Sequence, residues 1–297
     1  MGKYLVTGAT GNVGRSLLRH LCAQSRDFPV VAGVRDPAAV RWEFPRSTRL
    51  KTIPFDFESE HTWPRALAGC DRLFLLRPPS ISDVDRIFRP LIHYCCSLEP
   101  KPGVVFLSVQ GAEKSSLIPH HKIERLLAHS GLAYVVIRPG YFMQNLTTTL
   151  KIDVLVNRHI RLPAGDARFN WVDVEDVGAV AASAMCRLDE YRGRVLEVTG
   201  SESLGFAEAT ATINRAVGAD IRYSNRNPVT FILDRLRRGE QLPWVMVVTL
   251  LHFLPRIQGT PPLTATVQEV TGRAPRTLAM FARDNRHLFL GNREDAP

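Results

Sequence analysis

The sequence has little of several features that mark other classes of protein. It contains only five cysteines (Cys22, Cys70, Cys95, Cys96 and Cys186), and no two of them have C-x-x-C spacing. This pattern argues against a disulfide framework and against zinc, so we expect no metal site. The longest apolar stretch, residues 244–254, is also short. A membrane-spanning helix needs about 20 apolar residues, so we expect no membrane partner.

Lysine is scarce as well. Only six of the 38 basic residues are lysines, and the formal net charge is +9. The arginines are scattered along the chain, which suits phosphorylated small molecules as well as nucleic acids. Because no zinc spacing or RNA-binding signature accompanies them, we do not expect a nucleic acid as the main partner. The N-terminus lacks the apolar core of a signal peptide, which favours a cytoplasmic location.

Short apolar runs alternate with helical patterns in the first half of the chain. The runs that predict strands are residues 3–7, 30–35, 51–55, 72–76, 103–108, 133–138 and 195–199. Continuous apolar strands separated by helices predict an α/β fold, with a Rossmann-like doubly wound parallel sheet and helices on both faces. We expect an NADP-binding domain over 1–145, to which 171–200 returns. Residues 146–297 would mostly form a small substrate-covering part, with a flexible tail at 291–297.

A glycine-rich loop follows the first predicted strand. Its sequence, GATGNVG, has the spacing G-x-x-G-x-x-G and leads into a helix expected to begin at about Asn12. Glycines at a strand–helix turn allow close approach of a pyrophosphate, which the helix N-terminus then attracts. We therefore predict dinucleotide binding by the residues of this loop: Gly8, Thr10, Gly11, Asn12, Val13 and Gly14.

The end of the second predicted strand bears on the choice between NAD and NADP. An NAD site usually has an acidic residue there that binds the ribose 2′-hydroxyl, whereas this chain has Arg35. A guanidinium suits a 2′-phosphate, so NADP(H) is the predicted cofactor. Two alternatives stay open: Asp36 could bind the hydroxyl, although Pro37 suggests that it lies in the turn, or Arg35 could be a solvated loop residue.

Several stretches resemble the NmrA-like group of atypical short-chain dehydrogenases/reductases. They include GATGNVG from Gly8, VRDP from Val34, RPGYFMQN from Arg138, WVDVEDVGAVAA from Trp171 and TGRAPRT from Thr271. The resemblance implies a Rossmann-like domain that binds NADP(H). It also implies that Asp56 and Phe57 hold the adenine. Leu76, Arg77 and Pro78, which follow the fourth predicted strand, would line the cofactor at the carboxyl edge of the sheet.

The catalytic pattern departs from the usual one. Short-chain reductases typically use Tyr-x-x-x-Lys, but Ile118 stands four residues before Lys122. Isoflavone-reductase-like relatives place a lysine eleven residues before a glycine that resembles Gly131, and this chain has His120 there. His120, His121 and Lys122 are therefore rival candidates, and Lys122 is also a candidate for binding the cofactor ribose. A solvated basic cluster is the alternative.

Other candidates for the reacting centre come from the ends of later strands. Ser108 stands where related reductases hydrogen-bond a substrate carbonyl, and Tyr141 is the tyrosine offered as a proton donor, with packing as its alternative. Phe142 is expected near the nicotinamide. We expect Asp173 to cap a helix and Thr277 to cap the helix 278–288. The apolar helix around Met246 could roof an apolar substrate or pack the core of its own domain.

These observations together predict an NADPH-dependent reductase that transfers hydride to a small apolar acceptor such as a quinone, a carbonyl compound or an iminium, with secondary metabolism as one setting for it. The alternative is a catalytically silent NADP(H) sensor that regulates a protein partner, as the regulators of the family do. Both hypotheses use the same cofactor residues, so the fold cannot separate them. A monomer or a homodimer is expected.

Overall fold

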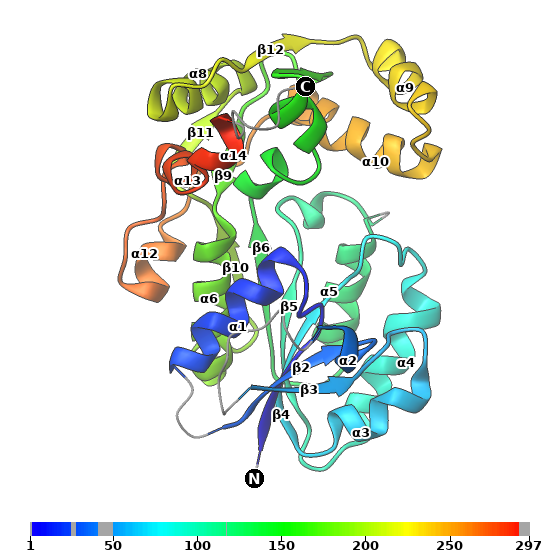
Figure 1. Cartoon of the computed structure of the whole chain (residues 1–297). Coiled ribbons are helices and arrows are strands. Elements are labelled where there is room, and N and C mark those ends of the chain that lie inside the picture. Colours follow the sequence, from blue (N-terminus) through cyan, green and yellow to red (C-terminus); the bar gives the residue numbers. More distant parts are fainter. Residues whose placement is uncertain (1, 25–27, 41–49, 117, 291–297) are drawn as a thin grey trace. The chain divides into compact units, whose positions relative to one another are not determined.

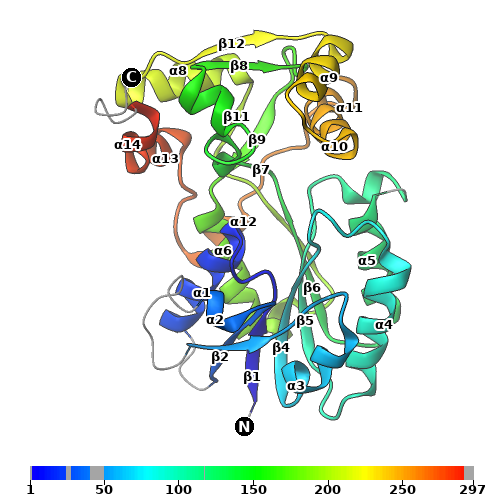
Figure 2. The same cartoon turned by 45° about the vertical axis from the view of Figure 1, so that its right-hand side comes forward.

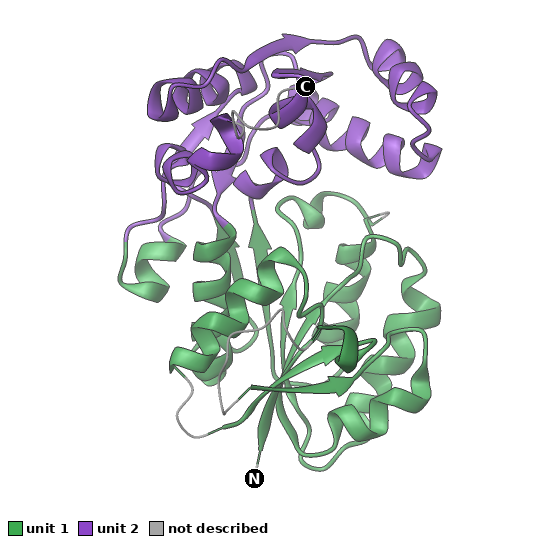
Figure 3. Ribbon diagram, in the orientation of Figure 1, with its two compact units in different colours: residues 1–139, 174–198, 266–273 green, residues 140–173, 199–265, 274–297 purple. Residues whose placement is uncertain are grey.

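The computed structural model describes residues 2–24, 28–40, 50–116 and 118–290 (Figure 1). The chain divides into two compact units (Figure 3). Unit 1 comprises residues 1–139, 174–198 and 266–273, and unit 2 comprises 140–173, 199–265 and 274–297. The sequence places the first boundary at 145 and does not predict the short return over 266–273. The tail 291–297 lies outside the described residues. In the part of the chain that the structure describes, no helix is long and apolar enough to cross a membrane.

Unit 1 contains a seven-stranded sheet in the order β3-β2-β1-β4-β5-β6-β10 (Figure 1). All neighbouring strands in it are parallel. The strands are β1 (Lys3–Val6), β2 (Val30–Val34), β3 (Leu50–Pro54), β4 (Cys70–Leu76), β5 (Gly103–Leu107), β6 (Tyr134–Pro139) and β10 (Val195–Val198). This arrangement confirms the predicted Rossmann-like sheet, and all seven strand predictions fall on its strands.

Helices cover both faces of this sheet (Figure 2). One face carries α1 (Asn12–Gln24) and α6 (Val174–Cys186), with α12 (Thr266–Thr271) beside α6. The other carries α3 (Trp63–Leu67), α4 (Val84–Ser97) and α5 (Pro119–His129), whose apolar side chains form one core with β1, β4 and β5. The short helices α2 (Pro37–Val40) and α7 (Leu188–Tyr191) follow β2 and α6. α1 and α6 pack closely because Gly178 has no side chain: a Cβ there would lie 2.2 Å from Ser16 Oγ.

Unit 2 is built on two small sheets and a set of helices. The sheets are β11 (Glu202–Leu204), β9 (Phe169–Val172) and β7 (Tyr141–Phe142), and the pair β12 (Arg222–Asn225) and β8 (His159–Leu162). Its helices are α8 (Phe206–Val217), α9 (Pro228–Arg237), α10 (Leu242–Phe253), α11 (Pro255–Gln258), α13 (Leu278–Asp284) and α14 (Arg286–Leu290). A π-helical turn covers Ile152–Val156. The core is a cluster of aromatic rings that includes Tyr141, Phe169, Trp171 and Phe206.

The last predicted helix, residues 278–288, is divided in two. Thr277 caps α13 as predicted, because its side chain accepts a hydrogen bond from the Met280 N–H. The single-helix prediction is wrong at Asn285, which ends α13 with a non-helical ψ of 22°. Its side-chain amide donates to the Phe281 carbonyl at 2.9 Å. Asparagine side chains that hydrogen-bond nearby backbone compete with helix continuation in this way.

Candidate functional site

The glycine-rich loop lies between β1 and the N-terminus of α1. The Gly11 N–H donates to the Gly8 carbonyl at 3.0 Å, which closes a tight turn. Gly8 has a φ of +60°, and a Cβ on it would lie 2.2 Å from Leu76 Cδ2. A Cβ on Gly14 would lie 2.2 Å from the Gly8 carbonyl oxygen, a backbone atom that cannot easily move. Only glycine therefore permits this turn at both positions.

The same loop leaves its outer residues open to a ligand. Thr10, Gly11 and Asn12 are exposed, whereas Val13 is buried beneath them. The first N–H groups of α1 point out of the helix without intrahelical partners, as at every helix start. An exposed helix N-terminus with close backbone approach fits a pyrophosphate group.

Arg15 is a basic residue at this loop that the sequence analysis did not single out. Its Nε donates to the Thr10 carbonyl at 2.7 Å, and the residue is exposed. The guanidinium is thus held at the loop and adds positive charge beside the expected phosphates. A basic residue directly after the third glycine was the available signal.

The turn after β2 separates the roles of Arg35 and Asp36. Asp36 Oδ1 accepts from the N–H groups of Ala38 at 2.9 Å and Ala39 at 3.3 Å, so this carboxylate caps α2. Arg35 is exposed one residue earlier, immediately after β2. The carboxylate that could have competed for a ribose hydroxyl is engaged in the turn, as Pro37 suggested.

The residues expected at the adenine lie in a turn after β3. Asp56 Oδ1 accepts from the Glu58 N–H at 3.0 Å, and the Asp56 carbonyl accepts from Trp63 Nε1 at 3.0 Å. Phe57 is only 6% exposed and packs against Phe88 in the core, with ring centroids 5.5 Å apart. Asp56 is partly exposed, so of these two side chains it is the more accessible to a ligand.

Arg77 folds over the loop that follows β4. Its Nη1 donates to the carbonyls of Pro78 at 3.1 Å, Pro79 at 3.3 Å and Ile81 at 2.6 Å. Burial lowers the pKa of Arg77, and its Nε has no hydrogen-bond partner among the described residues. The Arg77 side chain therefore stiffens the loop at the carboxyl edge of the sheet. The Leu76 side chain packs directly against Gly8 of the glycine-rich loop.

Ser108 belongs to a buried polar network at the ends of β5 and β6. It is 2% exposed and donates its hydroxyl proton to Glu124 Oε1. Arg138 holds the same carboxylate through two bonds, from Nε at 3.0 Å and from Nη2 at 2.6 Å, and it also pairs with Glu113 at 2.7 Å. Hydrogen bonding to Glu124 raises the pKa of Arg138.

This network changes what Ser108 can do. Because the Glu124 side chain accepts from both Arg138 and Ser108, the single donor hydrogen of the Ser108 hydroxyl is already used. Donation to a substrate carbonyl would require that buried bond to break. The sequence analysis missed Glu124, although it stands one helical turn after His120 in α5.

The charge of Arg77 acts on His120, whereas Lys122 faces a different surface. Burial, and then the charge of Arg77, lowers the pKa of His120 to about 3. The imidazole is therefore neutral near pH 7 and is not a proton donor of the imidazolium type. Lys122 is exposed and lines a hollow between α4 and α5 together with Asp85 and Arg89.

Tyr141 lies in the aromatic core of unit 2. Its hydroxyl is 2.9 Å from His252 Nε2, and His252 Nδ1 is 2.7 Å from the Val248 carbonyl. Since a carbonyl only accepts, Nδ1 carries the proton and Nε2 accepts from Tyr141. Burial raises the pKa of Tyr141 and lowers that of His252 to about 4. The tyrosine proton is thus engaged internally, which argues against Tyr141 as the donor. Phe142, which follows it in β7, pairs with Val172.

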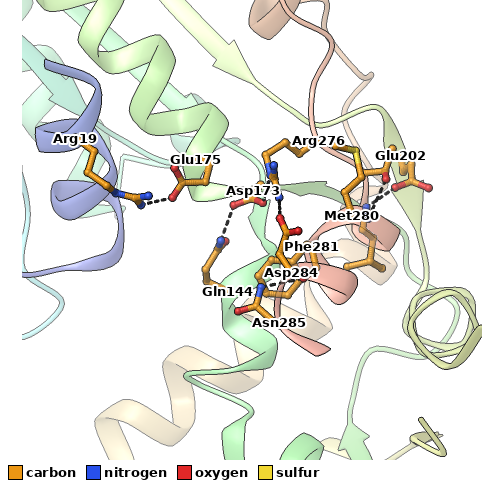
Figure 4. A network of polar contacts seen from close by, with 12 residues as sticks. Arg19, Gln144, Asp173, Glu175, Glu202, Arg276, Met280, Phe281, Asp284 and Asn285 are labelled. Carbon is orange, nitrogen blue, oxygen red and sulfur yellow. Dashed lines mark hydrogen bonds and ion pairs between the residues drawn. The ribbon is translucent and has the colours of Figure 1, made fainter. Parts of the chain in front are cut away.

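Asp173 ties two distant parts of unit 2 together (Figure 4). Its carboxylate accepts from Gln144 Nε2 at 2.6 Å and from Arg276 Nε at 2.7 Å. Arg276 also pairs with Asp284 in α13. Two segments of the family resemblance, WVDVEDV and TGRAPRT, meet through this ion pair, so Asp173 braces this region of unit 2. Its role as a helix cap stays a prediction.

The apolar helix α10 directs its polar residues inward. Thr249 and His252 are buried, as are Val245 and Val248. The remaining surface is exposed and apolar, and consists of Leu242, Trp244, Met246, Val247, Leu250, Leu251 and, just beyond the helix, Leu254. Packing the core of its own unit accounts for only one side of α10. Exposed apolar patches of this kind mark ligand or partner surfaces.

Comparison with known proteins agrees with this geometry. The sequence pattern of NAD(P)H-binding proteins matches residues 8–86, and that of the NmrA-like family matches residues 108–250. Prestalk A differentiation protein A of Dictyostelium discoideum is 30% identical, over 94% of this chain and 91% of that protein. The NAD(P)H azoreductase of Xenophilus azovorans is 28% identical, over 96% of this chain and 98% of that protein.

A solved structure supports the same assignment of the fold. The NADPH-dependent quinone oxidoreductase of Escherichia coli in complex with NADPH superposes with a TM-score of 0.83 at 21% identity, over 95% of this chain and 99% of that one. Its sheet-and-helix arrangement is therefore shared by the chain described here. The glycine-rich loop has no room for side chains at Gly8 and Gly14, and the similarity to known proteins extends over nearly the whole chain. This chain therefore belongs to the NmrA-like family of NAD(P)H-binding atypical short-chain dehydrogenases/reductases.

Proposed function

We propose that this protein is an NADPH-dependent reductase that transfers a hydride to a small apolar acceptor. The observation that carries the proposal is the loop of Gly8 and Gly14, where an added Cβ would clash at 2.2 Å and where the start of α1 stays open. Such a loop fits the pyrophosphate of a dinucleotide. Bound NADPH supplies the hydride.

The residues of the chain bind and orient the cofactor in this proposal. Thr10, Gly11 and Asn12 hold the pyrophosphate through backbone N–H groups, and Arg15 adds a neighbouring positive charge. Arg35 binds the 2′-phosphate, because Asp36 is engaged in capping α2. NADP(H) is therefore favoured over NAD(H). Arg77 keeps the loop after β4 in a fixed shape.

The acceptor class follows from the protonation of the candidate residues. The Ser108 hydroxyl donates a hydrogen bond to Glu124, the Tyr141 hydroxyl donates one to His252, and His120 is neutral. None of these three is poised as an acid. An activated acceptor such as a quinone or an iminium needs little help from a general acid, so positioning and exclusion of water would supply most of the rate.

The test is NADPH oxidation against a panel of quinones, iminium compounds, azo compounds and simple ketones, followed at 340 nm. We expect turnover with the activated acceptors and little with the ketones. Tight NADPH binding without turnover of any acceptor would contradict the proposal.

The second candidate is an NADP(H)-sensing regulator. The observation that favours it is the relative from Dictyostelium discoideum, which is named as a differentiation protein and matches 94% of this chain. A regulator would bind the cofactor with the same loop. Tight binding, no turnover, and retention of a specific protein partner only in the presence of NADP(H) would identify this role.

A further inference from the structure

Arg77 is a half-buried cation that directly follows β4, at the carboxyl end of that strand. Its Nη1 donates to the carbonyls of Pro78, Pro79 and Ile81, while its Nε is buried without an acceptor in the described part of the chain. Carbonyl groups are dipoles and carry no net charge. Burial alone lowers the pKa of Arg77, and no carboxylate among the described residues pairs with it. The guanidinium is therefore held in place while its charge has no counterion there.

Arg138, near the carboxyl end of β6, provides a contrast. Three carboxylates contact its guanidinium: Glu124 at 2.6 Å, Glu113 at 2.7 Å and Glu197 at 3.4 Å. Hydrogen bonding to Glu124 raises the pKa of Arg138, which is the opposite direction to that of Arg77. Of these two arginines, Arg77 is the one whose positive charge is left to act on a ligand at this edge of the sheet.

The order of the strands places Arg77 relative to the proposed cofactor site. Arg35 follows β2, the glycine-rich loop follows β1 and Arg77 follows β4, and the sheet has the order β2-β1-β4-β5 (Figure 1). With the 2′-phosphate at Arg35 and the pyrophosphate at the loop, the nicotinamide half of the cofactor extends over the ends of β4 and β5. His120, whose pKa is lowered by burial and then by the charge of Arg77, lies 6.2 Å from the ring of Phe106 in β5. Arg77 is therefore on the nicotinamide side.

A count of the charges shows what Arg77 can bind on that side. The negative groups of NADPH are its pyrophosphate and its 2′-phosphate, and in the proposed site both have partners in the glycine-rich loop, Arg15 and Arg35. The nicotinamide and its ribose carry no negative charge. An anion beside Arg77 must therefore belong to the acceptor, either from the start or as it is reduced.

Quinones and iminium ions differ in the charge that they acquire. Hydride transfer to a quinone delivers two electrons and one hydrogen and gives a hydroquinone monoanion, which one proton from water then completes. Hydride transfer to an iminium ion instead cancels a positive charge. A fixed cation stabilises negative charge that develops on an oxygen in the transition state, and it repels a cationic acceptor.

We propose that Arg77 is the residue that selects the acceptor: its guanidinium stabilises negative charge on the acceptor oxygen, so that acceptors that become oxyanions, such as quinones, are reduced in preference to iminium ions. This inference rests on the proposed reductase function. It assigns to Arg77 a role beyond the stiffening of its loop, because the Nη1 bonds to carbonyls leave the charge uncompensated.

The kinetic test compares menadione, a quinone, with an N-methyl dihydroisoquinolinium ion at saturating NADPH. Arg77→Met keeps an apolar stem and removes the charge. It should lower kcat/KM for menadione by about tenfold to a hundredfold, the range for loss of one charged donor to an oxyanion, and should leave that for the iminium unchanged or raised. Arg77→Lys, which keeps the charge and can still donate to the loop carbonyls, should recover part of the loss.

Arg86→Met is the matched control, because it removes one positive charge from α4 of the same unit. The Arg86 side chain is 67% exposed and pairs with Glu58 at 3.1 Å. This variant should keep the ratio of the two kcat/KM values. A purely structural role of Arg77 would instead slow both acceptors alike and weaken NADPH binding, which is measured in parallel with the melting temperature.

A second readout does not need turnover. Para-nitrophenol, whose phenolate is distinguished by its absorbance, is titrated into the protein loaded with NADP⁺. Wild type should bind the phenolate and lower the apparent pKa of the bound phenol, and Arg77→Met should bind it at least about tenfold more weakly.

The two readouts separate this inference from the proposed function. Absence of turnover with every acceptor would contradict the reductase, and the phenolate titration would still test Arg77. An unchanged ratio of menadione to iminium in Arg77→Met, or equal phenolate binding by wild type and Arg77→Met, would overturn the role of Arg77. A loss of NADPH affinity as large as the loss in menadione reduction would also overturn it, because Arg77 would then bind the cofactor.

Discussion

In the proposed function, cofactor selectivity depends on Arg35, and its replacement by alanine gives a sharp prediction. The residue is exposed directly after β2, and the neighbouring Asp36 is engaged with the N–H groups of Ala38 and Ala39. Arg35→Ala removes the hydrogen bonds to the 2′-phosphate and nothing else that the structure records. Bonds of this kind to charged groups contribute about 1–3 kcal/mol, so NADPH affinity should fall about 5- to 150-fold. The affinity for NADH, which lacks the 2′-phosphate, should hardly change.

The assay is titration of each nucleotide by the change in its fluorescence, at low and at high salt. The loss should shrink at high salt, since an exposed ion pair is screened. Arg35→Lys should lose less, and Asp36→Ala should keep the NADPH preference while it loses the cap of α2. If wild type prefers NADH, or if Arg35→Ala weakens both nucleotides equally, the assignment of Arg35 to the 2′-phosphate is wrong.

Three further predictions concern the glycine-rich loop, the buried Tyr141 and its hydrogen-bond partner His252. Gly14→Ala should abolish binding of both nucleotides, and Gly11→Ala, whose Cβ would lie 3.3 Å from the Gly8 carbonyl, should weaken it less; titration compares them. Tyr141→Phe should lower the melting temperature, because it leaves His252 Nε2 buried without a donor, yet it should cost less than about tenfold in single-turnover hydride transfer. A thousandfold loss would show that the tyrosine is the acid. Burial lowers the pKa of His252 to about 4 in the folded protein, against about 6.5 in the unfolded chain. The neutral imidazole therefore contributes its full share to the free energy of unfolding above about pH 6.5. Up to about 3 kcal/mol should be lost as the pH falls from 6.5 to 4, and urea unfolding at several pH values, with His252→Gln as the control, measures that slope.

The fold was predictable because its signals are local and strong. Seven apolar runs became the seven strands of one sheet, and the helix expected from about Asn12 does begin there. Thr277 likewise caps the helix that was expected after it. Asn285 shows the limit: its side chain hydrogen-bonds the Phe281 carbonyl, and the segment 278–288 that was predicted as one helix is divided there.

The candidate site was predictable where backbone shape matters and less so where side-chain partners matter. The glycine loop follows from spacing alone, since steric contact fixes it. The partners of Ser108 and Tyr141 come from residues 16 and 111 positions away, Glu124 and His252, and no local pattern marks such pairs. The hydrogen-bond partners of Ser108 and Tyr141 are therefore visible in the structure and not in the sequence.

The order in which the chain builds its two units constrains how the protein can be made. The chain passes between the units at residues 139/140, 173/174, 198/199, 265/266 and 273/274. During synthesis, β6 has no neighbour on its outer side until β10 has been made as far as residue 198, so it forms an unpaired sheet edge for that time. Translation at about 5–20 residues per second leaves that edge available for several seconds. Neither unit can be expressed by cutting the gene once, and a nascent chain stalled between β6 and β10 would be a natural client for chaperones.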